Sequence, residues 1–189
     1  MDNTKLVATT SNNNSIYFWD PANNYREMGS LNTSEIQMCI KWCGAVEGSY
    51  KVNMLFTGGI DNIIHAWDVQ TKTEITFKDE IEKNDKPHVK HTECIMDILP
   101  IPGQNRLATA SLDSNIALWS LRDLKPIKLL TDHQSGVYCL EWNEEMNMLM
   151  SCGLDHDIYI WNPICDNKIF MLKGHNHSLV GVKCLKGTN

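Results

Sequence analysis

The 189-residue sequence has no stretch of about 18 apolar residues, so it contains no candidate transmembrane helix. It also has no basic cluster, since 17 Lys and Arg stand against 23 Asp and Glu and the net charge is −6. Nucleic acid and anionic membranes are therefore not expected as partners, because both require concentrated positive charge. The amino-terminal residues MDNTKLVATT lack the basic and then apolar pattern of a signal peptide.

Paired cysteine motifs are absent as well. The seven cysteines are odd in number and none belongs to a C-x-x-C pair, which favours reduced thiols over a disulfide framework. Hydrophobic residues make up 42% and charged residues 21%, which is typical of a globular protein and too apolar for a disordered one. These properties predict a soluble, cytoplasmic chain with a single domain over residues 1–189.

What the sequence does contain is an internal repeat. Four segments align without gaps, near residues 6–20, 53–68, 105–120 and 147–162. The tryptophan near the end of each segment is Trp19, Trp67, Trp119 or Trp161. The residue six positions before it is Asn13, Asp61, Asp113 or Asp155. A hydroxyl stands ten positions before it, on Thr9, Thr57, Thr109 or Ser151.

Each segment has the pattern of a β-hairpin. In the third, Leu107 and Thr109 alternate with other residues before the polar turn LDSN, and Ile116 and Leu118 alternate after it. Asp or Asn suits such a turn because its side chain can bond the backbone one or two residues on. No segment shows a sustained helical period, so the sequence predicts an all-β protein.

A second element lies between the hairpins. KHTECIMDIL, DHQSGVYCLEW and GHNHSLVGVKCL align through His91, His133 and His175, and Thr33 occupies the same place before the second hairpin. The spacing from His91 to Trp119 and from His133 to Trp161 is 28 residues in both cases. Longer spacings elsewhere indicate inserted surface loops near residues 43–52 and 76–90.

A Gly-His element, a hydroxyl and Asp on a hairpin, and a Trp-Asp end, repeated every 42 to 52 residues, resemble the WD-repeat β-propeller family. The resemblance implies about four blades of four antiparallel strands. In each blade the Asp, His, Ser or Thr, and Trp side chains are implied to form a buried hydrogen-bonded network. The propeller as a whole is implied to be a platform for protein partners.

The implied networks differ between the repeats. Two are complete, one with His91, Thr109, Asp113 and Trp119 and the other with His133, Ser151, Asp155 and Trp161. The second repeat keeps Thr57, Asp61 and Trp67 but has Thr33 in place of the histidine. The first has Asn13 in place of the aspartate. These departures predict weaker or differently satisfied networks in the first two blades.

Two other functions are conceivable from the same letters. A hydrolase could use Ser151 or His156, and a metal site could combine His88, His91, Glu93 and Cys94. Because Ser151 and its aspartate recur as Thr109 and Asp113, they are interpreted as repeat scaffolding, and no oxyanion hole is apparent. No pair has metal-ligand spacing. We therefore expect no enzymatic activity, catalytic residue, cofactor or metal.

The count of strands leaves the assembly open. The sequence begins on the second strand of a blade, near Leu6–Thr10, and its last strand, near Leu179–Leu185, is the first strand of another. Three arrangements fit: part of a larger propeller, a half-propeller completed by a second copy or another chain, or a four-bladed ring closed by pairing those two strands.

The resemblance also suggests where a partner binds. In this family the residue before the turn aspartate lies at the mouth of the central channel, and here it is Ile60, Leu112 or Leu154 in three neighbouring blades. Exposed apolar clusters mark interfaces. We therefore predict a non-enzymatic protein–protein interaction scaffold within a larger assembly. The tail LKGHNHSLVGVKCL resembles repeats of long ciliary WD-repeat proteins, which points to a cilium or axoneme.

Overall fold

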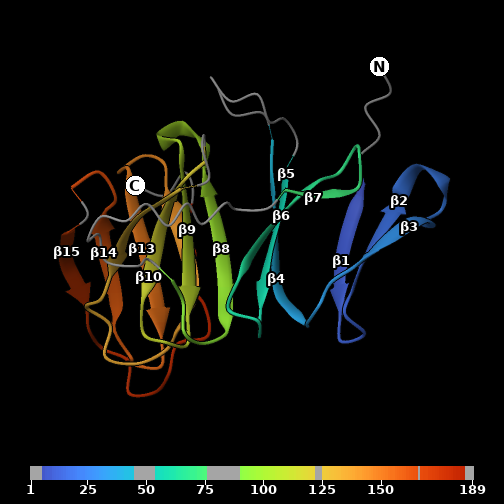
Figure 1. Ribbon diagram of the computed structural model, residues 1–189. Coiled ribbons are helices and arrows are strands. Elements are labelled where there is room, and N and C mark those ends of the chain that lie inside the picture. The colour runs from blue at the N-terminus through green and yellow to red at the C-terminus, as the bar shows by residue number, and fades with distance from the viewer. Residues whose placement is uncertain (1–5, 45–53, 76–89, 122–124, 166, 186–189) are drawn as a thin grey trace, which may run out of the picture.

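The computed structural model describes residues 6–44, 54–75, 90–121, 125–165 and 167–185, and these form an all-β fold of four antiparallel sheets (Figure 1). The first sheet contains β1 (Val7–Ser11), β2 (Ser15–Asp20) and β3 (Arg26–Asn32). The second contains β4 (Gln37–Cys43), β5 (Met54–Gly59), β6 (Ile64–Asp68) and β7 (Thr73–Ile75). The third contains β8 (Ile95–Ile101), β9 (Arg106–Ser111), β10 (Ile116–Ser120) and β11 (Pro126–Leu130). The fourth contains β12 (Val137–Asn143), β13 (Met148–Gly153), β14 (Ile158–Asn162) and β15 (Asn167–Leu172).

This architecture confirms the predicted all-β fold with about four propeller-type blades, three of them four-stranded and the first three-stranded. The helical elements of the described residues are two 3-10 turns, η1 (Pro21–Asn23) and η2 (Pro102–Gln104). No helix in the described part of the chain is long and apolar enough to span a membrane.

The tight turn within each repeat hairpin has the same backbone conformation. Its second residue has a positive φ in all four sheets: 58° at Asn14, 64° at Asn62, 68° at Ser114 and 65° at His156. The aspartate before it supports the turn, since Asp61 Oδ1 accepts from Ile63 N at 3.2 Å and Asp113 Oδ1 accepts from Asn115 N at 2.9 Å. His156 is therefore a turn residue in the left-handed region.

The sheets lie side by side in chain order, with β4, β8 and β12 as neighbouring inner strands and β7, β11 and β15 as outer strands (Figure 1). The middle strands bury both faces, because successive side chains point to opposite sides of a sheet. Leu55 and its cross-strand partner Trp67 pack toward the first sheet, whereas Phe56 and its partner Ala66 pack toward the third. The core is thus a series of apolar layers between sheets.

The repeat tryptophans occupy these layers in a regular way. Trp67 packs with Ile16 and Phe18 of the first sheet, Trp119 with residues of the second and third, and Trp161 with residues of the third and fourth. Each of these three tryptophans therefore packs its own sheet against the preceding one. Burial of one such side chain contributes roughly 2–3 kcal/mol, which makes these layers the main source of cohesion between sheets.

The carboxyl-terminal segment differs from expectation. Residues 173–185 form no strand among the described residues, although the sequence predicts one near Leu179–Leu185. The segment lies beside the fourth sheet, where Leu179 N donates to Gly153 O at 2.8 Å and Val180 is 88% exposed. A β-strand forms only where its backbone is hydrogen-bonded to a neighbouring strand, and no strand of the described residues pairs with this segment.

Within the described residues, the first and last predicted strands do not pair to close a four-bladed ring. Strand β1 is hydrogen-bonded to β2 alone within the described residues, and the first and fourth sheets lie at opposite ends of the molecule (Figure 1). The two predicted inserted loops lie outside the described residues, apart from Cys43, Gly44 and Lys90 at their ends.

Candidate functional site

The fourth sheet contains a buried chain of hydrogen bonds at the end of the strands nearest the turn. Trp161 Nε1 donates to Ser151 Oγ at 2.7 Å, and Ser151 Oγ lies 2.7 Å from His133 Nε2. His133 Nδ1 lies 2.6 Å from Asp155 Oδ2. Because a carboxylate only accepts, Nδ1 is the donor there and Nε2 accepts from the Ser151 hydroxyl. Burial lowers the pKa of His133, which favours this neutral tautomer.

The third sheet repeats this arrangement with threonine in place of serine. Trp119 Nε1 donates to Thr109 Oγ1 at 3.0 Å, Thr109 Oγ1 lies 2.7 Å from His91 Nε2, and His91 Nδ1 lies 3.0 Å from Asp113 Oδ2. The same carboxylate accepts from Thr92 N at 2.9 Å. Burial opposes ionisation of Asp113, but the hydrogen bonds from His91 and Thr92 prevail and hold its pKa below the usual value.

In the second sheet, different residues bind the turn aspartate. Trp67 Nε1 donates to Thr57 Oγ1 at 3.0 Å, as elsewhere, but Thr33 stands in the place of the histidine. Asp61 Oδ2 instead accepts from Gln37 Nε2 at 3.0 Å and lies 2.8 Å from Nε2 of His65, a residue of strand β6.

His65 is bound on both sides. Its Nδ1 is hydrogen-bonded to Glu74 of the outer strand β7, so two carboxylates flank one imidazole. Burial opposes protonation of this ring, yet the bonds to Asp61 and Glu74 raise the pKa of His65 above its usual 6.5. Sequence reasoning missed this histidine. The available signals were its position four residues after Asp61 and its place opposite Thr57 in the hairpin.

The first sheet has the smallest polar arrangement. Trp19 Nε1 donates to Thr9 Oγ1 at 2.9 Å, and Asn13 Nδ2 donates to the Tyr17 hydroxyl at 2.9 Å. Both contacts are near the surface. The network therefore becomes progressively larger and more buried from the first sheet to the third and fourth.

The residues of the hydrolase alternative are not assembled for catalysis. Ser151 is 0% exposed and its Oγ is bonded to His133 and Trp161, whereas His156 is an exposed turn residue. For the metal alternative, His91 is committed to Thr109 and Asp113, and His88 lies outside the described residues. Within the described residues, no three His, Cys, Asp or Glu side chains are grouped so that they could hold a metal ion.

The three residues proposed to contact a partner lie in equivalent places at one end of the sheets. Each backbone N–H bonds a carbonyl at the start of the inner strand: Ile60 to Ile36 O at 3.2 Å, Leu112 to Cys94 O at 3.0 Å, and Leu154 to Gly136 O at 2.8 Å. We call Ile60, Leu112 and Leu154 the turn face. Ile60 is 47% exposed, while Leu112 and Leu154 are half-buried.

The half-burial of Leu112 has a specific cause. A methyl group placed on Gly136, in the segment leading into β12, would lie only 3.0 Å from Leu112 Cδ2. The leucine side chain therefore packs on the neighbouring sheet. The turn face is a row with one prominent residue, Ile60, and two partly covered ones.

The comparison with protein families agrees with this geometry. Residues 85–120 and 124–162 match the family model described as WD domain, G-beta repeat. The chain carries WD repeats. The first matched segment contains β8 to β10 of the third sheet, and the second contains β11 of that sheet and β12 to β14 of the fourth. Each segment holds one of the two complete networks.

Individual relatives extend the similarity beyond these two WD repeats. Cilia- and flagella-associated protein 337 B of Tetrahymena thermophila is 29% identical over 98% of this chain. Protein transport protein SEC31 of Chaetomium globosum is 29% identical over 84% of it, and WD repeat-containing protein WDS homolog of Arabidopsis thaliana is 29% identical over 56%. The chain spans only 14%, 12% and 19% of the length of these relatives, in that order.

The sheets are also joined by an aspartate that the alignment of the repeats does not single out. Asp97 of β8 accepts from Leu140 N of the fourth sheet at 2.9 Å and from Ile98 N at 2.9 Å. Lys41 Nζ of the second sheet lies 3.6 Å from the same carboxylate. One buried side chain thus contacts inner strands of three consecutive repeats.

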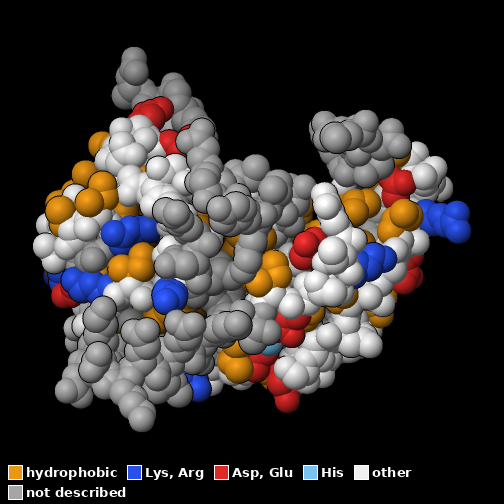
Figure 2. All heavy atoms as spheres, turned by 45° about the horizontal axis from the view of Figure 1, so that its top comes forward, with side chains coloured by type: hydrophobic (Ala, Val, Ile, Leu, Met, Phe, Trp, Pro, Cys, Tyr) orange, Lys and Arg blue, Asp and Glu red, His pale blue; other side chains and the backbone are white. Residues whose placement is uncertain are grey.

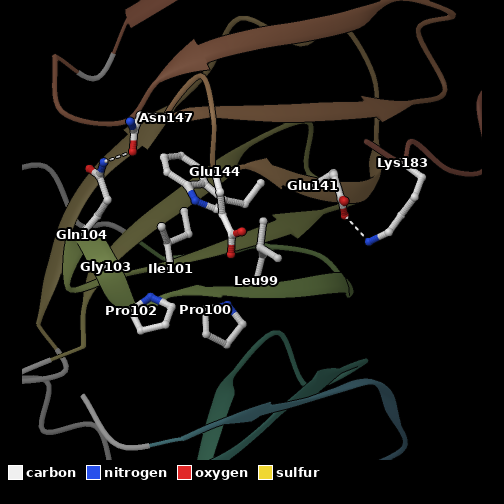
Figure 3. Close-up of a pocket in the computed structure, with 11 residues that line it drawn as sticks. Leu99, Pro100, Ile101, Pro102, Gly103, Gln104, Glu141, Glu144, Asn147 and Lys183 are labelled. Carbon is white, nitrogen blue, oxygen red and sulfur yellow. Dashed lines mark hydrogen bonds and ion pairs between the residues drawn. The ribbon is translucent and has the colours of Figure 1, made fainter. Parts of the chain in front are cut away.

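A pocket of about 420 Å³ lies at the opposite end of the sheets from the turn face, between the third and fourth WD repeats (Figure 3). Its walls include Pro100 and Pro102 from the end of β8 and from η2, and Trp142 from β12. The Glu141–Lys183 ion pair at 2.7 Å borders it on one side (Figure 3). The wall of the pocket therefore combines apolar side chains with the carboxylate of Glu141.

A second apolar surface lies on β15, the outer strand of the fourth sheet. Ile169, Phe170 and Leu172 of β15 are exposed. Figure 2 shows hydrophobic side chains gathered at that end of the molecule, next to lysine and arginine side chains. A test of the turn face as an interface must therefore include this strand as a competing surface.

Proposed function

We propose that this chain is a non-enzymatic scaffold that binds a partner protein through the turn face. The observation that carries the proposal is the placement of three apolar residues, Ile60, Leu112 and Leu154, at equivalent positions of neighbouring WD repeats. A backbone hydrogen bond holds each of these residues, and the aspartate that follows each one is bound by a network. We therefore expect the row to be preorganised before a partner binds. A preorganised surface loses less conformational entropy on binding.

The burial of the Ser151, His133 and Asp155 side chains supports the same proposal. The Ser, His and Asp side chains that could suggest a hydrolase are bonded to one another in the interior, with Ser151 fully buried. A nucleophile must reach its substrate and needs donors that stabilise the developing oxyanion. The networks instead satisfy buried polar groups and fix the position of each turn.

We further propose that the scaffold acts in a cilium or axoneme. The support is the similarity to Cilia- and flagella-associated protein 337 B, which extends over 98% of this chain. A tagged copy expressed in ciliated cells should concentrate along the ciliary shaft. A uniform distribution in the cell body, with the cilium empty, would refute this part of the proposal and leave the scaffold function untouched.

The interface is tested by affinity capture from ciliated cells with wild-type chain, Ile60→Asp and Ile127→Asp. Ile60 is 47% exposed and Ile127, on the outer strand β11, is 41% exposed. The two changes therefore replace isoleucine side chains of similar exposure with a charge, at different places on the surface. A charge in the middle of an apolar interface typically costs more than 2 kcal/mol, a loss of roughly 30-fold or more in affinity. Capture of a defined partner should be lost with Ile60→Asp alone.

A third variant, Ile169→Asp, addresses the competing surface on β15. If binding is lost with Ile169→Asp and retained with Ile60→Asp, the turn face is not the interface. Circular dichroism of each purified variant establishes that it has folded. Light-scattering mass at low micromolar concentration, compared with the 21.5 kDa of one chain, shows whether the partner is a second copy.

A further inference from the structure

Two cysteines of the fourth sheet face each other across neighbouring strands. Cys139 of β12 is the register partner of Cys152 of β13, next to a bulge between Val137 and Cys139. Residues directly opposite in an antiparallel pair project to the same side of the sheet, with Cα atoms about 4.5–5.5 Å apart. A disulfide needs Cα atoms roughly 4.4–6.8 Å apart, so the backbone already holds this pair at bridging distance.

The two thiols have different environments. Cys152 is completely buried, whereas Cys139 is half-buried, and both are free thiols. The hydrogen bond with Cys152 lowers the pKa of Cys139 to about 7, and the same contact raises the pKa of Cys152. At neutral pH Cys139 therefore has appreciable thiolate character, which is the reactive form, and Cys152 stands behind it as a thiol.

This pair is particular to the fourth sheet. The equivalent positions in the second sheet are Cys39 and Gly58, and in the third they are Asp97 and Ala110. Cys39 is buried, and burial raises its pKa well above the usual value. It provides a matched comparison, because it has the same strand position without an opposing thiol.

We propose that Cys139 and Cys152 are a redox modification site that closes to a cross-strand disulfide when the chain meets a low-molecular-weight disulfide such as oxidised glutathione. The Cys139 thiolate attacks one sulfur of the oxidant, forming a mixed disulfide and releasing one thiolate. Cys152 passes its proton to that thiolate and attacks the Cys139 sulfur, releasing the second thiolate. That thiolate takes up from solvent the proton that Cys139 lost when it ionised. Two protein thiols are oxidised and one disulfide is reduced to two thiols.

The site is coupled to the carboxyl-terminal segment. The Cys139 thiol donates to Val182 O at 3.9 Å, one of the contacts that hold residues 173–185 beside the fourth sheet. In the reduced chain the thiol fraction of Cys139 makes this contact, whereas a disulfide sulfur has no proton to donate. Oxidation should therefore increase amide hydrogen exchange around Val182, while exchange in the second sheet stays unchanged.

The experiment exposes the reduced full chain to oxidised glutathione at pH 7.5, quenches with an alkylating reagent and maps the peptides without reduction. The expected product has lost two of its seven thiols and contains one peptide cross-linked between Cys139 and Cys152. Exposed Cys165 reports how far surface thiols have reacted. The proposal is overturned if Cys165 is modified while Cys139 and Cys152 both remain open to alkylation after unfolding.

Variants distinguish the attacking role of Cys139 from the resolving role of Cys152. Cys152→Ala should retain one glutathione on Cys139, because the resolving thiol is missing, whereas Cys39→Ala should form the cross-link like the wild type. If Cys139→Ser still loses the Cys152 thiol at the wild-type rate, Cys139 is not the attacking residue and the proposal fails. The wild-type peptide map decides the question even if a variant does not fold.

Discussion

The network hydroxyls allow one test in which the same substitution is made at three equivalent positions. Thr→Val keeps the shape of the side chain and replaces the hydroxyl with a methyl group, which cannot hydrogen-bond. At Thr109 the change removes the partner of both His91 Nε2 and Trp119 Nε1 in a fully buried place. Each orphaned buried polar group costs about 1–3 kcal/mol, so Thr109→Val should lower the free energy of unfolding by about 2–6 kcal/mol.

The other two positions give a graded comparison. Thr57→Val leaves one buried donor, Trp67 Nε1, without its acceptor, and about 1–3 kcal/mol is expected. Thr9 accepts from Trp19 near the surface, where water can replace the hydroxyl, so Thr9→Val should cost about 0.5 kcal/mol or less. The predicted order of destabilisation is Thr109, then Thr57, then Thr9.

The assay is urea unfolding followed by tryptophan fluorescence, with thermal unfolding by circular dichroism as a second measure. For a chain of this size, 1 kcal/mol shifts Tm by roughly 2–4 °C, so Thr109→Val should lower Tm by roughly 4 °C or more. The three variants should share one urea m-value. Equal losses for Thr9→Val and Thr109→Val would show that the buried networks are not the source of the difference between the sheets.

Three further predictions concern individual residues. Because the pKa of His65 is raised in the folded state, protonated His65 stabilises the fold, and this stabilisation is fully present below pH 6.5 and lost as pH rises through the folded pKa. The Tm difference between wild type and His65→Gln should therefore shrink from pH 6 to pH 9, and a constant difference would contradict this. Asp97→Ala orphans Leu140 N and Ile98 N and should cost about 2–6 kcal/mol in urea unfolding, against less than about 1 kcal/mol for the exposed Asp132→Ala. Gly153→Ala would place Cβ 2.1 Å from Gly136 O and should cost at least about 2 kcal/mol, whereas Gly103→Ala, with no atom within 4 Å, should leave Tm nearly unchanged.

The recurring parts of the fold could be predicted from the sequence because hairpin register fixes them. Trp119 is the cross-strand partner of Leu107, and Thr109 lies two residues further along the same strand. Diagonal neighbours of this kind are within reach of an indole. The same offset in four segments therefore predicts the same contact in four sheets, and it is made each time from Trp19 to Trp161.

The parts that occur once could not be predicted in this way. His65 holds the place that Ala117 and Tyr159 occupy in the next two sheets, so alignment gives it no special status. Thr33 stands in the place of the network histidine and its hydroxyl donates to Glu35 O, so Asp61 is bound instead by Gln37 of β4 and His65 of β6. Asp97 is similar, since its partners come from sheets more than 40 residues away in sequence on either side.

The carboxyl-terminal segment shows a different limit of prediction from sequence. Its pattern of apolar residues matches the inner strands, yet residues 179–185 are not a strand in the described structure. Sequence patterns report which face a residue would bury, but a strand also needs a neighbour with free hydrogen-bonding groups. No strand of the described residues offers such groups to residues 179–185.

The two-sided burial of the middle strands has a consequence for how the chain can be divided. All six residues of β5 are buried, so this strand has no face on which a charged side chain could remain in water. Natural sequences usually protect exposed strands from self-association with such charges. A single sheet expressed alone would turn two apolar faces to solvent without that protection. Cutting between sheets should therefore yield aggregates, and a dispersed fragment would need an adjacent sheet or a substitute that covers the same layer.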